Sequence, residues 1–216
     1  YATANDAAVI IFKTYNESNI NKIKFSAINS ISDVEELADE DLDSSSELHV
    51  SIGGNTSGIG QTEAQNFSID SAGKTIYFLD NINNEKNYGD LYKINVSEES
   101  TQKAELYDAD VSTTLTRFIS EDKYMYYKDV KAMVGELYIN KDSIDYDVSL
   151  DYTKYDDKSD AIAYFTDWNS EKSYGTLKVQ NNDESSKIAD DVHAFNFTPS
   201  GEVLYLYDYS SNYSKG

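Results

Sequence analysis

Short runs of alternating apolar and polar residues recur along this chain, and most of its tyrosines and phenylalanines lie in them. Alternation with a period of two is typical of half-buried β-strands, because aromatic and β-branched side chains pack well on a pleated surface. Helical periodicity is nearly absent. The segment 34–42, with Val34, Leu37 and Leu42 as its apolar positions, is the one place that suggests a helical turn or two. The pattern therefore predicts an all-β protein.

One order of features is repeated along the chain. An aromatic residue is followed by a turn, an apolar run, Asp or Thr, a loop, and then glycine-x-apolar. Copies of this order occupy residues 67–80, 118–129, 155–167 and 197–208, with a weaker copy at 1–14. Their equivalent aspartates lie about 40–50 residues apart, and self-similarity at that period is typical of repeat architectures. The equivalent positions are Asp80, Asp129, Asp167 and Asp208.

Four strands are predicted in each repeat. The first ends at the turn, and the second is the apolar run, found at 76–79, 125–127, 162–165 and 204–207. The third follows a glycine, which we expect to leave the preceding loop with φ > 0. The fourth ends in an Asp-Val pair. The glycines are Gly89, Gly135 and Gly175, and the pairs are Asp110-Val111, Asp147-Val148 and Asp191-Val192.

Four short antiparallel strands per repeat are typical of a propeller blade, which must stack on its neighbours to bury both faces. The first repeat is longer, and its acidic stretch 33–47 and glycine-rich stretch 53–60 are interpreted as loop insertions. Gly216 stands where a third strand of the fifth repeat would begin. The expectation is a β-propeller-like fold with four complete repeats plus half of a fifth. Residues 1–216 would form a single repeat domain belonging to a longer chain.

Two segments carry a resemblance to a known family. Phe197-Thr-Pro-Ser-Gly201 precedes the apolar run 203–206, and Phe67-Ser-Ile-Asp-Ser-Ala-Gly73 precedes the run 76–78. Both resemble TolB-type propeller repeats, which carry an aromatic-x-Ser-Pro-Asp-Gly turn, an apolar strand and a Gly-x-apolar-Tyr strand. The repeats are also similar to propeller-like regions of bacterial membrane-anchored proteins of unknown function. The resemblance implies protein, peptide or glycan binding and supplies no catalytic residues.

Charge and composition narrow the classes of partner. The chain has 18 Lys and Arg against 39 Asp and Glu, a formal charge of −21. That field repels phosphate backbones and anionic lipids, so nucleic acid and a membrane surface are disfavoured as partners. There is no cysteine, which excludes disulfides and thiolate chemistry, and no apolar run is long enough to cross a bilayer. The Asn-, Tyr-, Lys- and Ile-rich, Pro-poor usage favours a low-GC bacterium. The expected location is extracellular or on the cell surface, with any export or anchoring segment outside the chain.

Two similar loops between the second and third strands are the candidate ligand site. They are Asn84-Glu-Lys-Asn-Tyr-Gly89 and Ser170-Glu-Lys-Ser-Tyr-Gly175. Loops after the second and fourth strands share one end of such a sheet, so these loops would form a rim with flat aromatic faces for a sugar or a side chain. Alternatively, the tyrosines pack on the next repeat. The candidate binding residues are Asn84, Tyr88, Trp168, Asn169 and Tyr174.

Other candidate chemistry is weaker. Asp39, Asp41, Asp43, Ser45 and Glu47 alternate as in a calcium loop, but Ser44 replaces the turn glycine and Val50 the closing bidentate Glu. A solvated acidic loop is the favoured interpretation, with weak calcium binding as the alternative. No catalytic, cofactor or metal residue is predicted.

The two histidines, His49 and His193, are far apart in sequence. No serine occupies the centre of a Gly-x-Ser-x-Gly nucleophile elbow; in Gly54-Asn-Thr-Ser-Gly58 the serine is one position away from that centre. The sequence thus favours a non-catalytic extracytoplasmic binding module for a protein, peptide or wall glycan. One alternative is a propeller that gates or presents substrate to a hydrolase domain outside the chain. Another is a glycoside-active propeller that uses acidic residues.

Overall fold

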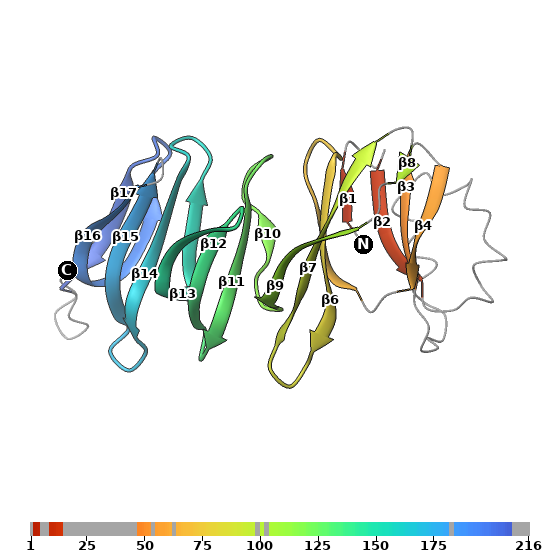
Figure 1. Ribbon diagram of the computed structural model, residues 1–216. Helices are drawn as coiled ribbons and strands as arrows, with labels where there is room; N and C mark the ends of the chain where they lie inside the picture. Colours follow the sequence, from red (N-terminus) through yellow and green to blue (C-terminus); the bar gives the residue numbers. More distant parts are fainter. Residues whose placement is uncertain are drawn as a thin grey trace. The chain divides into compact units, whose positions relative to one another are not determined.

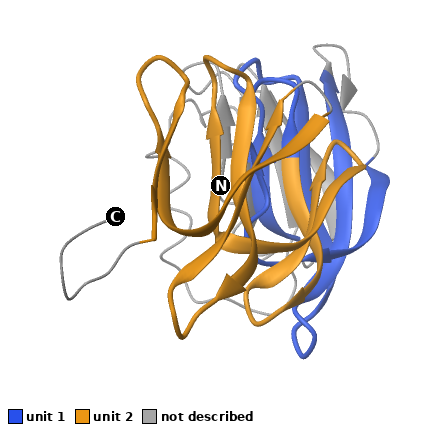
Figure 2. Ribbon diagram, turned by 90° about the vertical axis from the view of Figure 1, so that its left-hand side faces the viewer, with its two compact units in different colours: residues 1–124 blue, residues 125–216 orange. Residues whose placement is uncertain are grey.

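The computed structural model describes residues 2–4, 9–14, 47–52, 55–61, 64–97, 100–101, 104–181 and 184–208, with side chains described for 64–96, 104–181 and 184–208. Every regular element in these ranges is a β-strand, and every described register is antiparallel. The chain forms two compact units, 1–124 and 125–216 (Figure 2), and their strands are labelled in Figure 1. The all-β antiparallel prediction is confirmed, and each unit is described below by itself.

Unit 1 holds one four-stranded sheet and a second run of four paired strands, each following the order of the chain. The first has the order β1-β2-β3-β4, formed by Ala2–Ala4, Val9–Thr14, Glu47–Ile52 and Asn55–Gln61. The second has the order β5-β6-β7-β9, formed by Gln65–Ile69, Thr75–Asn83, Tyr88–Ser97 and Glu105–Ser112. Two short strands complete the unit: β8, Ser100–Thr101, which pairs with β7, and β10, Arg117–Phe118.

In unit 2 the strands are also hydrogen-bonded in chain order, from β11 to β17. Two of them are long, β13 with 15 residues and β16 with 14. The first half of each pairs with the preceding strand and the second half with the following one. The strands are Tyr124–Lys131 (β11), Val134–Ile139 (β12), Asp142–Asp156 (β13), Ala161–Asn169 (β14), Tyr174–Asn181 (β15), Glu184–Phe197 (β16) and Val203–Tyr207 (β17).

The expectation that the fourth strand ends at Asp-Val is wrong in unit 2, because β13 and β16 run on to become the first strand of the next repeat. Each aspartate of these pairs is left-handed, with φ of 55° at Asp110, 54° at Asp147 and 53° at Asp191. The ladder register shifts at these points, as in a β-bulge. The following valines, Val111, Val148 and Val192, are fully buried. Aspartate tolerates the left-handed conformation better than most residues, so the Asp-Val pair marks a bend rather than an end.

The expectation for the glycines before the third strands is also wrong. The left-handed glycines in the described residues are Gly73 and Gly201, whereas Gly89, Gly135 and Gly175 are not among them. A Cβ at Gly89 or Gly135 would lie 2.8 Å from a backbone oxygen of the preceding strand, and one at Gly175 would lie 3.0 Å away. These positions need glycine for close approach of two strands and not for φ > 0.

The left-handed residue near the end of the second strand is Asn or Asp. It is Asn81, Asp129, Asp167 and Asp208, with φ between 49° and 53°. The β6–β7, β11–β12 and β14–β15 registers all shift immediately after it. The structural counterpart of Asp129, Asp167 and Asp208 is therefore Asn81, and not Asp80 as the sequence pattern indicated. The position of the bulge, and not the residue type, identifies the corresponding residues.

The predicted turn before the second strand is present in two copies with one pattern of hydrogen bonds. Gly73 N donates to Asp70 O and Gly201 N to Thr198 O, each at 3.0 Å. In each turn a side-chain oxygen also accepts from a backbone amide four residues on, Asp70 Oδ1 from Lys74 N at 2.7 Å and Thr198 Oγ1 from Glu202 N at 3.1 Å. Gly73 and Gly201, with φ of 70° and 84°, supply the left-handed residue of each turn.

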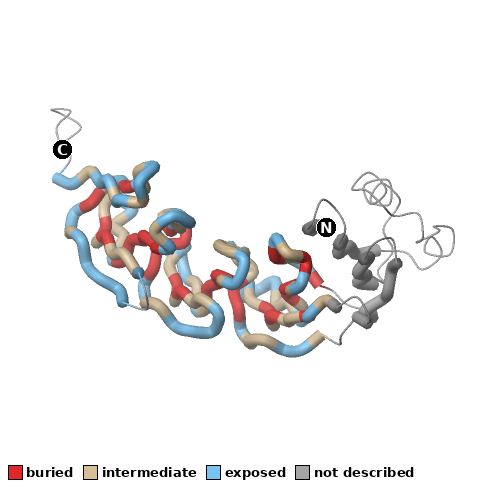
Figure 3. Tube along the Cα trace, turned by 90° about the horizontal axis from the view of Figure 1, so that it is seen from above, coloured by how far each residue is buried: buried red, intermediate tan, exposed pale blue. Residues whose placement is uncertain are grey.

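Burial is concentrated on the second strands. Figure 3 shows the buried residues in red along the chain. In unit 1, Ile76 and Phe78 pack with Ala64 and Ile94. In unit 2, residues 161–166 of β14 are buried without a break, since both faces of this strand are covered. One core cluster of unit 2 consists of Ala163, Phe165, Leu177, Val192 and Phe195.

Part of the first repeat's predicted insertions cannot be compared with the structure. The possible helix at 34–42 and nearly all of the acidic stretch 33–47 lie outside the described residues. The glycine-rich stretch is not simply a loop: Asn55–Gln61 forms β4 and pairs with β3. The register shifts between Leu48 and His49, opposite Gly58 and Gly60, which is where glycine is expected in a strand.

Candidate binding site at the hairpin ends

Two hairpins, β6–β7 and β14–β15, share one local structure. Four-residue turns at 84–87 and 170–173 connect their strands. Asn83 Oδ1 accepts from Lys86 N at 3.1 Å, and Asn169 Oδ1 accepts from Lys172 N at 3.0 Å. The last turn residue is left-handed in both hairpins, with φ of 56° at Asn87 and 54° at Ser173. An asparagine side chain that caps the turn and a left-handed closing residue together explain why these two loops have similar sequences.

A tyrosine paired with a lysine follows each turn. The Lys86 Nζ atom lies 5.8 Å from the ring centroid of Tyr88, and Lys172 Nζ lies 5.9 Å from that of Tyr174. These are cation–π distances. Both tyrosines are half-buried while both lysines are exposed. Each hairpin thus presents a phenol and an ammonium group side by side, next to an exposed glutamate, Glu85 or Glu171.

The residues just after the Asp-Val bend lie beside the hairpin in both units. In unit 1, Thr113 N donates to Asn87 O at 3.0 Å, and Asn66 Nδ2 donates to Thr113 O at 2.7 Å. In unit 2, the Tyr174 and His193 rings meet edge to face, with centroids 5.8 Å apart. His193 therefore forms part of the surroundings of Tyr174.

Trp168 is packed against the core of unit 2. Its ring stacks on Phe165 at a centroid distance of 5.2 Å and lies 4.2 Å from the ring of Tyr152. These contacts occupy much of the indole surface that a ligand would need, so they favour packing over ligand stacking for this residue.

The two asparagines named by the sequence are not equivalent. Asn169 caps its turn, and its structural counterpart is Asn83 rather than Asn84. Asn84 is an exposed turn residue at the position of Ser170. Of the five candidate residues, Trp168, Asn169 and Tyr174 lie at the β14–β15 hairpin of unit 2, and Asn84 and Tyr88 at the β6–β7 hairpin of unit 1.

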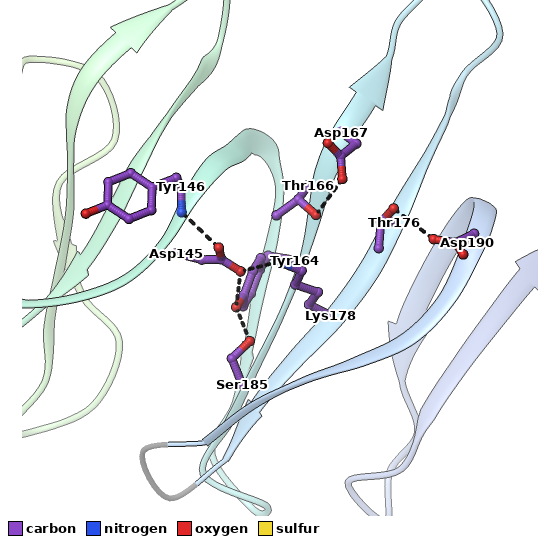
Figure 4. Close-up of polar contacts among 9 residues, drawn as sticks. All are labelled: Asp145, Tyr146, Tyr164, Thr166, Asp167, Thr176, Lys178, Ser185 and Asp190. Atoms are coloured by element: carbon purple, nitrogen blue, oxygen red, sulfur yellow. Dashed lines mark hydrogen bonds and ion pairs between the residues drawn. The ribbon is translucent and has the colours of Figure 1, made fainter.

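A polar network in unit 2 was not foreseen (Figure 4). The Tyr164 hydroxyl donates to Asp145 Oδ2 at 3.0 Å and lies 2.6 Å from Ser185 Oγ. Lys178 Nζ lies 2.8 Å from the same Asp145 oxygen. These four residues come from β13, β14, β15 and β16, so the network ties together strands of two successive repeats.

This network replaces an aromatic pair of the other repeats. Phe78 and Tyr92 stack at 5.5 Å, and Tyr126 and Tyr138 at 5.3 Å, at positions that correspond by register to Tyr164 and Lys178. The signal in the sequence is the change from Gly-x-Leu-Tyr to Gly-x-Leu-Lys in the third strand at 175–178. The partner of this lysine, Asp145, could not be identified without the tertiary structure.

Burial raises the pKa of Tyr164, and the adjacent Asp145 charge raises it further, while the Ser185 hydrogen bond lowers it. A phenol held neutral in this way is a poor base or nucleophile at neutral pH. The arrangement instead suits a structural hydrogen bond, with Lys178 balancing the charge of Asp145.

Metal and histidine chemistry gain no support within the described residues. In that part of the chain, no three His, Asp or Glu side chains are grouped as metal ligands, and no helix is long and apolar enough to cross a membrane. The acidic stretch 39–47, whose carboxylates alternate as in a calcium loop, lies outside it, apart from Glu47 at the start of β3. His49 lies within β3, opposite Phe12 of β2 and Gly58 of β4.

Comparison with known proteins gives little further information. No protein-family model matches the chain, and no curated protein matches it in sequence. Among solved structures, it is similar to the Pyrococcus horikoshii acylaminoacyl peptidase in its orthorhombic crystal form, with a TM-score of 0.42 and 12% sequence identity. The match covers 71% of this chain and 29% of that chain. A similarity of this size supports no conclusion about function.

Alkaline pH is expected to destabilise the protein. Burial is the largest cause of the raised pKa of Tyr77, Tyr124 and Tyr164. A raised pKa means that the folded state favours the neutral phenol. The contribution of these phenols to the free energy of unfolding is therefore complete below the ordinary tyrosine pKa of about 10, and it is lost as pH rises above that value. Urea unfolding midpoints should fall from pH 9 to pH 11.

The Tyr164→Phe variant provides the matched comparison, because it lacks one of these buried hydroxyls. Its unfolding midpoint should fall less steeply over the same pH interval. Absorbance at 295 nm should show tyrosinate from the buried residues appearing together with unfolding. An unfolding midpoint that stays level or rises up to pH 11 would contradict the prediction.

Proposed function

We propose that this chain is a non-catalytic, extracytoplasmic binding module of propeller-like architecture, similar to TolB-type repeats and holding four complete repeats and half of a fifth. Its ligand is a protein, a peptide or a cell-wall glycan, held by the Tyr-Lys hairpins. The antiparallel four-stranded repeats, in which β13 and β16 pass from one repeat into the next, support the architectural part of the proposal.

The observation that carries the binding proposal is a difference between hairpins. The β11–β12 hairpin has a two-residue turn, Ala132 and Met133, and Val134 stands where Tyr88 and Tyr174 stand in the other two. Its backbone nevertheless makes the same connection, since Leu150 N donates to Met133 O at 3.0 Å as Thr113 N does to Asn87 O. The scaffold therefore closes without the tyrosine and lysine, which leaves them available for recognition.

The chemistry of the hairpins fits the proposed ligand classes. A half-buried phenol can pack against a sugar face or an apolar side chain, and the neighbouring lysine and glutamate can hydrogen-bond to hydroxyl, carboxylate or amino groups. The chain's charge of −21 favours neutral or basic ligands over anionic ones. An extracellular bacterial location agrees with the composition.

Binding can be followed with the single tryptophan, because Trp168 lies on the strand that leads into the β14–β15 hairpin. The probes are a soluble peptidoglycan fragment and an alanine-lysine peptide, each titrated into the whole chain. We expect one of them to change Trp168 fluorescence saturably, and the Lys172→Ala/Tyr174→Ala double variant to bind it at least tenfold more weakly.

Tyr146→Ala is the matched control, since Tyr146 is 65% exposed and lies outside the hairpins. It should bind like the unmodified chain. Equal loss of affinity in both variants would show that the signal does not come from the hairpin. Binding by neither probe would contradict the proposed ligand classes.

A further inference from the structure

The two Tyr-Lys hairpins, one in each unit, present the same side chains from the same backbone. Their sequences, Asn83-Asn-Glu-Lys-Asn-Tyr-Gly89 and Asn169-Ser-Glu-Lys-Ser-Tyr-Gly175, share five of seven residues. Exposure follows the same order in both, because the four turn residues are exposed, the tyrosine is half-buried and the glycine is buried. The distance from the lysine Nζ to the tyrosine ring centroid is 5.8 Å in one hairpin and 5.9 Å in the other.

The fold accounts for two of these five shared residues. The asparagine caps the turn, through Asn83 Oδ1 in one hairpin and Asn169 Oδ1 in the other. The glycine is needed because a Cβ would crowd the backbone of the preceding strand. The glutamate and the lysine are exposed in both hairpins, and the β11–β12 hairpin makes the same backbone connection with no equivalent Glu-Lys-x-Tyr segment. The shared Glu, Lys and Tyr therefore form one recognition set that occurs twice.

Two copies of one set of side chains suit a ligand that presents the same group repeatedly. A folded protein presents a given surface once per copy, whereas a linear glycan presents the same sugar at every repeat. An N-acetylated sugar matches the set: its carbonyl oxygen can accept from the lysine, its N–H can donate to the glutamate, and its methyl group and ring face can pack on the phenol. The chain's charge of −21 disfavours polyanionic glycans.

We propose that the chain is bivalent, and that each unit binds one segment of the same linear, neutral glycan of N-acetylated sugars. The binding segments are 85–88 in unit 1 and 171–174 in unit 2. This inference rests on the proposed function and adds to it the number of sites and the class of ligand. Two weak sites on one chain hold a polymer more tightly than either site alone, because the first contact raises the local concentration for the second.

Isothermal titration calorimetry with the β-1,4-linked tetrasaccharide of N-acetylglucosamine counts the sites on the whole chain. Two tetrasaccharides per chain are expected. Lys86→Ala/Tyr88→Ala and Lys172→Ala/Tyr174→Ala should each bind one, and the combination of both should bind none. Only Lys172→Ala/Tyr174→Ala should abolish the change in Trp168 fluorescence, because the single tryptophan lies on β14 of unit 2.

Retention on insoluble chitin measures the gain from two sites, since its dense repeats offer sugars at many spacings. The whole chain should bind chitin at least tenfold more tightly than either double variant. Tyr146→Ala, which changes a residue that is 65% exposed and outside the hairpins, should bind like the whole chain. Lys86→Glu and Lys172→Glu alter only exposed side chains and repeat the comparison if a tyrosine variant does not fold.

The possible results separate this inference from the proposed function. One tetrasaccharide per chain, or loss of both sites in one double variant, would overturn bivalency. Cellotetraose has hydroxyl groups in place of the acetamido groups and should bind at least tenfold more weakly; equal affinity would overturn the assignment to N-acetylated sugars. If the alanine-lysine peptide binds and the tetrasaccharide does not, the hairpin remains a binding site and the glycan inference fails. If no probe binds, both fail.

Discussion

Replacement of Phe165 by alanine is expected to destabilise unit 2 by about 3–5 kcal/mol, the usual range for removing a fully buried aromatic side chain. Phe165 has no exposed surface, and its ring meets Trp168 at 5.2 Å, Phe195 at 4.9 Å and Tyr152 at 5.5 Å. These partners come from three strands, β13, β14 and β16, so the cavity would open in the centre of the unit. Urea unfolding followed by Trp168 fluorescence measures the change.

Tyr146→Ala again serves as the control, because it removes an aromatic ring that is 65% exposed and should change the free energy of unfolding by no more than about 0.5 kcal/mol. Phe165→Leu should fall between the two. Equal midpoints for Phe165→Ala and Tyr146→Ala would mean that Phe165 is not packed as the structure shows.

The second large effect is expected at Gly135. A Cβ there would lie 2.8 Å from Lys128 O and 2.7 Å from Val130 Cγ2, closer than folded proteins allow. Gly135→Ala should therefore destabilise the protein by about 1–3 kcal/mol, the typical cost of overpacking. The lower chain entropy of alanine in the unfolded state acts in the opposite direction, by about 0.4–1 kcal/mol. Because overpacking is the larger of the two effects, a net loss of stability is expected, and a urea titration measures it.

Two further substitutions make the Gly135 result specific. Gly175→Ala should cost less, because its Cβ would lie 3.0 Å from Thr166 O and has no contact shorter than that. Asp142→Ala changes an exposed residue at the start of β13 and should leave the midpoint unchanged. Stabilisation by Gly135→Ala would refute the close approach of β11 and β12 at this point.

The hairpin ends and the strand core carry different information about this protein. The core positions of the repeats hold apolar or aromatic residues, whereas the hairpins differ from one another in length and in their polar residues. The Tyr-Lys pairs are absent from the β11–β12 hairpin, although its backbone closes in the same way. Among related chains, the residues at these hairpins are therefore expected to vary more than the core residues.

The strand positions were predictable because they depend on local pattern. The apolar runs at 76–79, 125–127 and 162–165 all lie within second strands, since alternating aromatic residues favour a pleated, half-buried surface wherever they occur. The turns at Gly73 and Gly201 were predictable for a similar reason, because the left-handed conformation is favoured by glycine itself.

The candidate site was predictable only in part. The two loops were recognised because they share sequence, and the structure confirms that they share a turn. The packing of Trp168 on Phe165 and Tyr152 was not visible, because Tyr152 reaches it from β13, another strand. The network of Asp145, Tyr164, Lys178 and Ser185 was missed for the same reason.

What the sequence determined by itself was therefore the all-β class, the four-strand repeat and the approximate strand positions, all of which depend on residues close together in the chain. The tertiary structure decided the meaning of the recurring Asp-Val and glycine signals. Asp147 bends a strand that continues into the next repeat, and Gly135 admits a neighbouring backbone that a Cβ would exclude. These roles depend on distances between strands, which a residue pattern along one strand does not contain.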